Sequence, residues 1–338
     1  MSHDQRHLVR QPSKIAGRET PRLQLHESRL GVVWRPLGNL RRIASMEILS
    51  NHRIQTFADI RGNEVHLLVK RLMRGRSEDG HNIVDMKLAF FETMLNVMMR
   101  MISGKRWIGV DKLEKKPKVL TEKRDSFMQD LIDEHRKMIR GCEGQRIQTL
   151  IDVLLSLQET DPECYTHEVI RGLMQVMLLA GTETSIATME WAILLLLNNP
   201  DALIQAQNEI DDRIGNSRLV DDSDLPHLPY LHAIVNETLR MYPPAPMLAP
   251  HESSIECMVG GYCVPAGTML LLNLWAIQHD PELWDEPKTF KSERFINFER
   301  KKRRICLDAI WLRKEAMPGR KFGNACCWLG LGVAHSML

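Results

Sequence analysis

Apolar residues in the first part of the chain recur every three or four positions, the spacing of one face of an α-helix. Residues 46–74 show this pattern and predict two helices, whose apolar face includes Ile60, Val65, Leu68 and Leu72. Residues 84–103 predict another helix. Its apolar face is expected to consist of Leu88, Phe91, Leu95, Met98 and Met99. The many methionines are interpreted as core residues.

Three further helices are predicted downstream. Residues 109–118 form a charged junction, interpreted as a surface loop, and residues 121–140 then predict a charged helix. Residues 168–198 are the longest candidate, roughly 45 Å long at 1.5 Å per residue, and end before Pro200 because the residue preceding proline avoids helical geometry. Residues 201–214 predict a helix that is closed by Gly215 and Asn216.

The pattern changes to short β-type runs over residues 256–272, where Gly260, Gly261 and Gly267 mark turns. We therefore expect a mainly α fold with a small β-sheet. No internal repeat or low-complexity segment interrupts it.

Composition narrows the functional classes. The chain has 338 residues, 43% of them hydrophobic, and a formal net charge of +2, which predicts no nucleic-acid partner. Seven scattered cysteines favour a reducing compartment over a disulfide framework, and no pair has the spacing of a zinc site. Residues 1–38 are polar, with no apolar run of membrane length.

Polar residues inside the longest apolar helix are the first candidate for chemistry. Glu183 and Thr184 stand in mid-helix, where a threonine hydroxyl can bond the carbonyl four residues earlier and open the helix locally. One interpretation is a polar face exposed to solvent. The apolar neighbours argue against it: Met177, Leu178, Leu179, Ile186, Met189 and Trp191.

Two further motifs follow. Glu237 and Arg240 are three residues apart and share one helix face, which fits a surface ion pair or part of a buried network. Residues 242–250 contain four prolines and cannot be helical, so they form an extended segment or simply a rigid linker.

In this order the motifs resemble the cytochrome P-450 monooxygenases, most closely the plant enzymes of the isoflavone 2'-hydroxylase type. The resemblance runs from about Asn39 to about Phe298 and implies a truncated cytochrome P-450 fold, with several dozen residues absent between Asp111 and Lys112. Its motifs are Leu-Leu-Ala-Gly-Thr-Glu-Thr-Ser at 178–185, Glu237-Thr-Leu-Arg240, Tyr242-Pro-Pro-Ala-Pro246 and Glu293-Arg-Phe295.

The resemblance implies a role for each motif. Gly181 lets haem and dioxygen approach the helix backbone, and Glu183 with Thr184 relays protons to bound oxygen. Arg294 joins Glu237 and Arg240 in a buried structural network, although Ser292 stands where the family usually has proline.

Two other assignments come from the same resemblance. Met247 and Leu248 line the substrate pocket. Arg41 pairs with a haem propionate, but the family places a tryptophan four residues before it, whereas Trp34 lies seven residues away.

As a family member, the chain is expected to be a haem-dependent monooxygenase that hydroxylates a small lipophilic plant metabolite. Electrons come from NADPH through a membrane-bound cytochrome reductase, at the cytosolic face of the endoplasmic reticulum. The family also begins with a membrane anchor and a proline-rich hinge, which residues 1–38 lack, and this favours the cytosol instead.

The cysteine motif that ligates haem iron is missing. The family pattern is Phe-x-x-Gly-x-Arg-x-Cys-x-Gly, and neither Cys306, Cys326 nor Cys327 has glycine and arginine at these offsets. Back-translation of residues 303–328 with synonymous codons, shifted by one base, gives a stretch with the complete pattern. The same shift over residues 1–38 gives pieces that resemble the family, including the missing tryptophan.

These matches divide the chain into three parts. Residues 1–38 and 299–338 are interpreted as out-of-frame segments, and residues 39–298 as the cytochrome P-450 core. The chain as written is then expected to hold no haem, to have no metal ligand and to be inactive. The alternatives are a haem-free helical binding protein and the product of a pseudogene.

Overall fold

The computed structural model describes residues 50–74, 83–107, 117–141, 148–215, 217–248, 250–253 and 255–296. Its helices are α3 (Asn51–Thr56), α4 (Ala58–Arg74), α5 (Met86–Ser103), α6 (Pro117–Gly141), α7 (Leu150–Thr160), α8 (His167–Asn198), α9 (Pro200–Arg213), α10 (Pro229–Met241) and α11 (Leu274–Gln278). Two 3-10 helices are η3 (Leu225–His227) and η4 (Ser292–Phe295), and the short strands are β1 (His251–Glu252), β2 (Cys257–Val259), β3 (Tyr262–Val264) and β4 (Met269–Leu270).

The mainly α class with little β structure is therefore confirmed. The expected single sheet is instead two antiparallel pairs within the described part of the chain: β1 with β4, and β2 with β3. Gly260 and Gly261, both at positive φ, turn the β2–β3 hairpin. A side chain is disfavoured there, which is why glycine occupies both turn positions.

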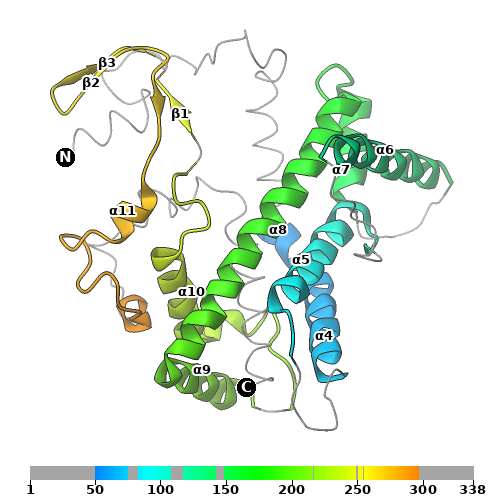
Figure 1. Ribbon diagram of the computed structural model, residues 1–338. Helices are drawn as coiled ribbons and strands as arrows, with labels where there is room; N and C mark the ends of the chain where they lie inside the picture. Colours follow the sequence, from blue (N-terminus) through cyan, green and yellow to red (C-terminus); the bar gives the residue numbers. More distant parts are fainter. Residues whose placement is uncertain are drawn as a thin grey trace.

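Helix α8 organises the described core. It runs diagonally across the molecule, with α5 crossing one side, α10 lying beside its lower half and α9 continuing from its end (Figure 1). The β2–β3 hairpin stands at the top left of the view and α9 at the bottom (Figure 1). At 32 residues, α8 is roughly 48 Å long, which agrees with the predicted helix.

The predicted helix boundaries follow from local signals. Asp85 caps α5 by accepting from the backbone N–H of Leu88 at 3.0 Å, and Gly104, at φ 69°, ends the helix in the left-handed conformation. Gly215, at φ 76°, follows α9 and donates to the Asp211 carbonyl at 3.0 Å. The glycine that predicted the end of this helix therefore does end it.

Helix α10 has no capping side chain of its own. Glu209 of α9 accepts from the backbone N–H groups of Tyr230 at 2.8 Å and Leu231 at 3.0 Å. A carboxylate at this end also interacts favourably with the helix dipole. Because the capping side chain belongs to α9, the sequence next to the start of α10 does not reveal it.

The buried face of α5 differs from the predicted one. Met98 and Met99 are buried, but Leu88 is exposed and Phe91 and Leu95 are only half-buried. The residues that α5 buries most completely are Ala89, Phe90, Met94, Val97, Met98, Met99, Met101 and Ile102. Because α5 packs against α4, α7 and α8 together, its burial is not confined to one stripe.

Buried charged groups join the helices on this side. Glu64 of α4, which is 2% exposed, accepts from Arg100 at 2.9 Å and from Arg106 at 3.0 Å. His135 of α6 lies between the Asp152 carboxylate at 2.9 Å and the Ser103 carbonyl at 3.0 Å. Helices α4 to α7 are thus linked by polar contacts as well as by apolar packing.

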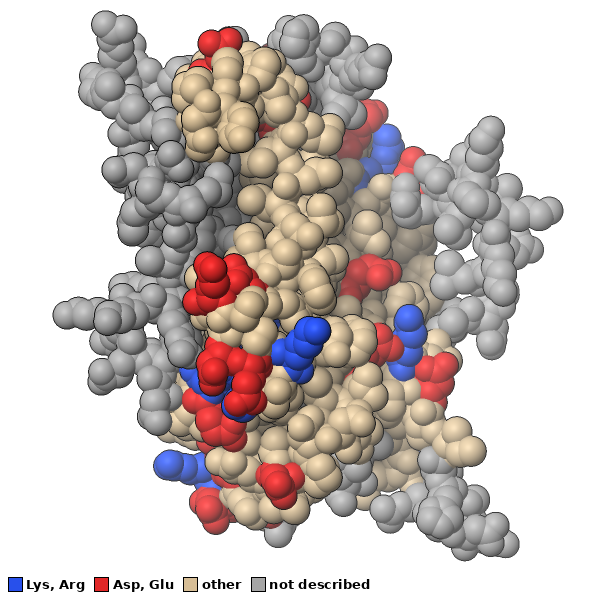
Figure 2. Space-filling view, turned by 60° about the vertical axis from the view of Figure 1, so that its left-hand side comes forward, with Lys and Arg blue, Asp and Glu red and all other residues tan. Residues whose placement is uncertain are grey.

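None of the described helices is both long enough and apolar enough to cross a membrane. On the face shown in Figure 2, a long uncharged stretch runs down the middle of the upper half and charged residues gather below it. Exposed apolar residues of the β2–β4 and α11 region include Met258, Tyr262, Met269, Leu271 and Trp275.

Candidate active-site face and its supporting network

The motif around Thr184 lies on an exposed stripe of α8. The Thr184 hydroxyl donates to the Ala180 carbonyl at 2.7 Å, and the Thr188 hydroxyl donates to the Thr184 carbonyl at 2.9 Å. The expected bond to the carbonyl four residues earlier is present. The expected local opening is absent, because α8 is continuously helical here.

Glu183 and Thr184 are both exposed, so the apolar neighbours did not predict their burial correctly. Residues three or four apart place them on one stripe that also exposes Val176, Leu179, Ala180, Trp191, Leu194 and Leu197. Leu179 is 65% exposed. The remaining side of α8 packs against α5, α7 and α10. The stripe, defined by these eight residues, is therefore a mostly apolar surface with one acid and one alcohol at its centre.

Gly181 is partly buried on the side of α8 that packs against α5. A Cβ atom built at this position would lie 2.7 Å from the sulfur of Met98, which is well inside van der Waals contact. The glycine therefore allows α5 and α8 to approach closely. Sequence reasoning assigned Gly181 to the approach of a cofactor and missed this helix-packing role, because nothing in the sequence around Gly181 identifies its neighbour.

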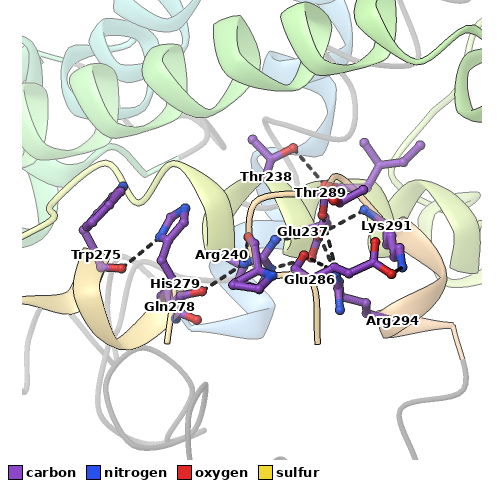
Figure 3. Close-up of polar contacts among 12 residues, drawn as sticks. Glu237, Thr238, Arg240, Trp275, Gln278, His279, Glu286, Thr289, Lys291 and Arg294 are labelled. Atoms are coloured by element: carbon purple, nitrogen blue, oxygen red, sulfur yellow. Dashed lines mark hydrogen bonds and ion pairs between the residues drawn. The ribbon is translucent and has the colours of Figure 1, made fainter. Parts of the chain in front are cut away.

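The structure brings Glu237, Arg240 and Arg294 together (Figure 3). One oxygen of the Glu237 carboxylate accepts from Arg240 Nε at 2.8 Å and the other from its terminal nitrogen, also at 2.8 Å. Arg294 Nε donates to Glu237 at 3.3 Å, and so does the backbone N–H of Lys291, at 3.0 Å. The Glu237 and Arg240 side chains are fully buried, and that of Arg294 is 6% exposed.

The remaining donors of Arg240 bind backbone carbonyls. They contact Gln278 at 2.9 Å and Pro287 at 2.8 Å, and the guanidinium lies over the Trp284 ring, 5.2 Å from its centre. Figure 3 shows α10 facing the α11 and η4 segments through these contacts. This arrangement is a buried network and not a surface ion pair, so it ties residues 278–294 to α10.

Ser292, which departs from the family pattern, has a specific partner. Its hydroxyl donates to the Tyr230 hydroxyl at 2.9 Å, and Ser292 is 1% exposed. Burial, together with the nearby Glu293 carboxylate, raises the pKa of Tyr230. The hydroxyl pair gives a second link between α10 and η4, beside the one made by Arg294.

The segment after α10 begins at Tyr242, whose ring stacks on the Trp191 ring of α8. The rings of Tyr242 and Trp191 lie 3.7 Å apart at 4° between planes. Pro246 accepts from the backbone N–H of Leu274 at 2.8 Å. The segment is not helical, as the prolines predicted, but it bends at Pro244 and Ala245 and turns over residues 246–247 into Leu248, whose φ is 53°. Met247 beside it is exposed.

Other predicted residues lie outside the described part of the chain. They are Arg41 and the three cysteines downstream of Arg294, which are Cys306, Cys326 and Cys327. Among the described residues, the free cysteines are Cys164, Cys257 and Cys263, and no group of three or more metal-binding side chains occurs.

The comparisons with known proteins decide the family. The cytochrome P450 family model matches residues 107–306, more than half of the chain. The chain belongs to the cytochrome P450 family. It is 41% identical over 332 residues to an isoflavone 2'-hydroxylase of Glycyrrhiza echinata, an alignment that covers 86% of this chain and 64% of that protein. The predicted resemblance to plant isoflavone 2'-hydroxylases is therefore confirmed.

Two further similarities extend beyond the isoflavone hydroxylases, one to another plant enzyme and one to a solved structure. The chain is 37% identical to a (+)-piperitol/(+)-sesamin synthase of Sesamum radiatum, over 94% of this chain and 70% of that protein. A zebrafish cytochrome P450 solved with abiraterone matches with a TM-score of 0.73 and 25% identity, covering 89% of this chain and 73% of the other. The chain thus spans about two thirds of the length of these curated relatives.

Proposed function

We propose that this chain descends from a haem-thiolate monooxygenase that hydroxylates a small lipophilic plant metabolite, and that the exposed stripe of α8 is the face that meets the cofactor. The observation that carries the proposal is the juxtaposition of Glu183 and Thr184 with exposed apolar residues on one helix, in a chain of the cytochrome P450 family. A relative named isoflavone 2'-hydroxylase, and another named for (+)-sesamin synthesis, support an aromatic plant substrate.

The described residues fit haem in part. An apolar stripe on one helix suits the face of a flat macrocycle, and haem bound through a cysteine thiolate supplies the activation of dioxygen. No described cysteine stands at the stripe. Cys164 precedes α8, whose first residue lies roughly 25 Å along the helix axis from Thr184, and Cys257 and Cys263 belong to the β2–β3 hairpin.

We propose that Thr184 and Glu183 assist proton transfer at this face. The hydroxyl proton of Thr184 is committed to the Ala180 carbonyl, so the lone pairs of Oγ1 remain available to accept from a water molecule on the stripe. The Glu183 carboxyl next to it is exposed and can exchange protons with solvent. Thr184 can therefore hold a water molecule at the centre of the stripe, and Glu183 can supply the proton that replaces one which this water gives up.

The Glu237 network is proposed to hold the fold under this face. It joins α10, which packs against α8, to the segments around Gln278 and Arg294. In a chain restored to the family pattern, Glu237→Ala is expected to abolish haem incorporation, because it leaves two buried guanidinium groups without a counter-charge. Met247 and Leu248 are proposed as substrate contacts and Arg41 as a propionate ligand.

We further propose that the chain as written binds no haem productively and is inactive, because the sequence after Arg294 lacks the cysteine motif. Electrons from NADPH through a cytochrome reductase, and attachment to the endoplasmic reticulum, belong to the restored enzyme. Residues 1–38 and 299–338 are proposed to be out-of-frame translations that flank a core at 39–298.

Two measurements test this. The coding DNA across residues 298–328 should give the Gly-x-Arg-x-Cys pattern in another frame, and its absence from all three frames rejects the frame-shift proposal. The purified chain, supplied with haem, reduced and exposed to carbon monoxide, should lack the absorbance band of a thiolate-ligated haem. A clear band shows that one of the cysteines does ligate iron, and contradicts the proposed inactivity.

A haem-free apolar binding protein is the second candidate. The exposed leucines and valine of the stripe favour it, because contiguous apolar surface marks a binding site or an aggregation risk. A stable, monomeric chain that binds a hydrophobic fluorescent probe, and releases it when Leu179 is changed to Glu, supports this function. Aggregation of the haem-free chain rejects it.

A further inference from the structure

The only described stacked ring pair that joins the stripe to the segment after α10 is Trp191 with Tyr242. The rings are nearly parallel, at 4°, and 3.7 Å apart. Trp191 is seven residues after Thr184, almost two helical turns, so it stands on the same side of α8 as Glu183 and Thr184. Trp191 is 37% exposed, so the stack with Tyr242 does not bury the ring completely.

Tyr242 is the residue at which α10 ends and the proline-containing segment begins. Its backbone N–H donates to the Thr238 carbonyl at 2.8 Å as the helix cap. Four residues later, the Pro246 carbonyl accepts from Leu274 at 2.8 Å and from Trp275 at 3.3 Å. The segment 242–248 is therefore attached at two points, one to α8 through the stack and one to the start of α11.

The backbone of residues 242–248 has little conformational freedom. Three prolines, at 243, 244 and 246, fix φ along the segment. Leu248 donates its backbone N–H to Ala245 at 3.0 Å in a turn. With a stiff segment attached at both ends, the position of Met247 and Leu248 relative to Thr184 depends on where the Tyr242 ring sits against α8.

We propose that Trp191 is a positioning residue: its stack with Tyr242 sets the placement of segment 242–248 against the Glu183–Thr184 face. The statement that Met247 and Leu248 contact substrate there rests on the proposed function. The mechanical coupling from Trp191 through Tyr242 to the Pro246 carbonyl does not, and it holds in the chain without haem.

Hydrogen exchange on the full chain tests the coupling. An aromatic pair contributes enough stabilisation for its loss to raise local opening about 2- to 10-fold. Trp191→Leu and Tyr242→Leu should each raise the exchange rates of the Leu274 and Trp275 amides by that factor. Trp191→Phe and Tyr242→Phe retain a stacked ring and should restore rates close to those of the unchanged chain.

Three controls separate positioning from general loss of stability. Trp107→Leu disrupts another aromatic pair, Trp107 with Phe127 at 5.2 Å, and should leave the Leu274 and Trp275 amides unchanged. The double variant Trp191→Leu/Tyr242→Leu should exchange no faster than either single one, because both remove the same contact. The near-ultraviolet circular dichroism of the stack should be lost in the leucine variants and kept in the phenylalanine variants.

The possible outcomes distinguish the positioning role of Trp191 from the proposed function. Unchanged exchange at Leu274 and Trp275 after the stack is lost overturns the positioning role, and so does a Trp191→Phe variant that exchanges as fast as Trp191→Leu. Failure of a restored chain to bind haem rejects the proposed function instead and leaves this coupling intact.

Discussion

Removing the charge of Glu237 is the sharpest test of the buried network. In Glu237→Gln, the side chain keeps its size and one oxygen acceptor but loses its charge. Four hydrogen bonds converge on the carboxylate: two from Arg240, one from Arg294 and one from the Lys291 backbone. The substitution leaves two guanidinium groups without a counter-charge, in positions that solvent barely reaches.

The expected cost follows from burial. Breaking a buried ion pair from one side costs about 3–5 kcal/mol. Arg240 keeps its bonds to the Gln278 and Pro287 carbonyls and its contact with Trp284, so the lower part of this range is expected. Domains are stable by about 5–15 kcal/mol in total, so about 3 kcal/mol is a large fraction of the free energy of unfolding.

Glu168 and Arg171 provide a matched control. They have the same three-residue spacing on a helix, with a nitrogen–oxygen distance of 3.4 Å, but the Glu168 side chain is 76% exposed. Solvent and counter-ions screen such a pair, so Glu168→Gln should cost less than about 1 kcal/mol, including the loss of a carboxylate from the first turn of α8.

The assay is urea unfolding followed by far-ultraviolet circular dichroism. The midpoint should fall clearly for Glu237→Gln with an unchanged slope, because the surface exposed on unfolding is the same. A midpoint that shifts no more for Glu237→Gln than for Glu168→Gln refutes the argument that burial gives the network its weight.

Three further predictions concern other parts of the molecule. Burial alone raises the pKa of the Asp152 carboxyl, but hydrogen bonds from His135 and Thr149 outweigh it and hold that pKa below its ordinary value. This contribution is present above the unfolded pKa and is lost as pH falls through the lowered one, so acid titration of the free energy of unfolding should be shallower below about pH 4 in Asp152→Asn. Gly181→Ala should cost no more than about 1 kcal/mol of unfolding free energy in urea titrations, because its Cβ meets chiefly the terminal Sδ and Cε atoms of the flexible Met98 side chain and alanine has the better helix propensity; a loss above about 3 kcal/mol contradicts this. In a restored chain, Thr184→Ala should keep haem but divert reducing equivalents from product to peroxide, measured as NADPH consumed per product formed; loss of haem in this variant contradicts the relay role.

Periodicity predicted most of the architecture, since amphipathic helices show their buried residues in the sequence. Ile60, Val65, Leu68 and Leu72 are all buried on α4, as expected. A single apolar face does not describe α5, because α4, α7 and α8 together bury several of its sides. On α8, the apolar flanks predicted burial for Glu183 and Thr184 that the structure does not show.

Contacts between residues far apart in the sequence could not be predicted from local patterns. The exception is a contact that the family resemblance itself implies. The resemblance brought Arg294 to Glu237 across 57 positions, because the family pattern carries that information. Nothing comparable points from Tyr242 to Trp191, from Gly181 to Met98 or from Ser292 to Tyr230. Each of these depends on how two elements approach, which no local pattern of the chain encodes.

The candidate site has two parts, the Glu237 network and the α8 stripe, and they differ in how completely their polar and apolar groups are covered. The network below α10 is complete: every described charge in it has a counter-charge or a carbonyl, and a partly satisfied buried network is costly. The stripe of α8 has its acid, its alcohol and its apolar residues exposed, so it can accept an apolar partner. The frame change that we propose lies downstream of every residue of this network, so it would spare the contacts around α10 and remove only the proposed haem ligand. Repairing the cysteine motif should then cover the stripe without altering the Glu237 contacts.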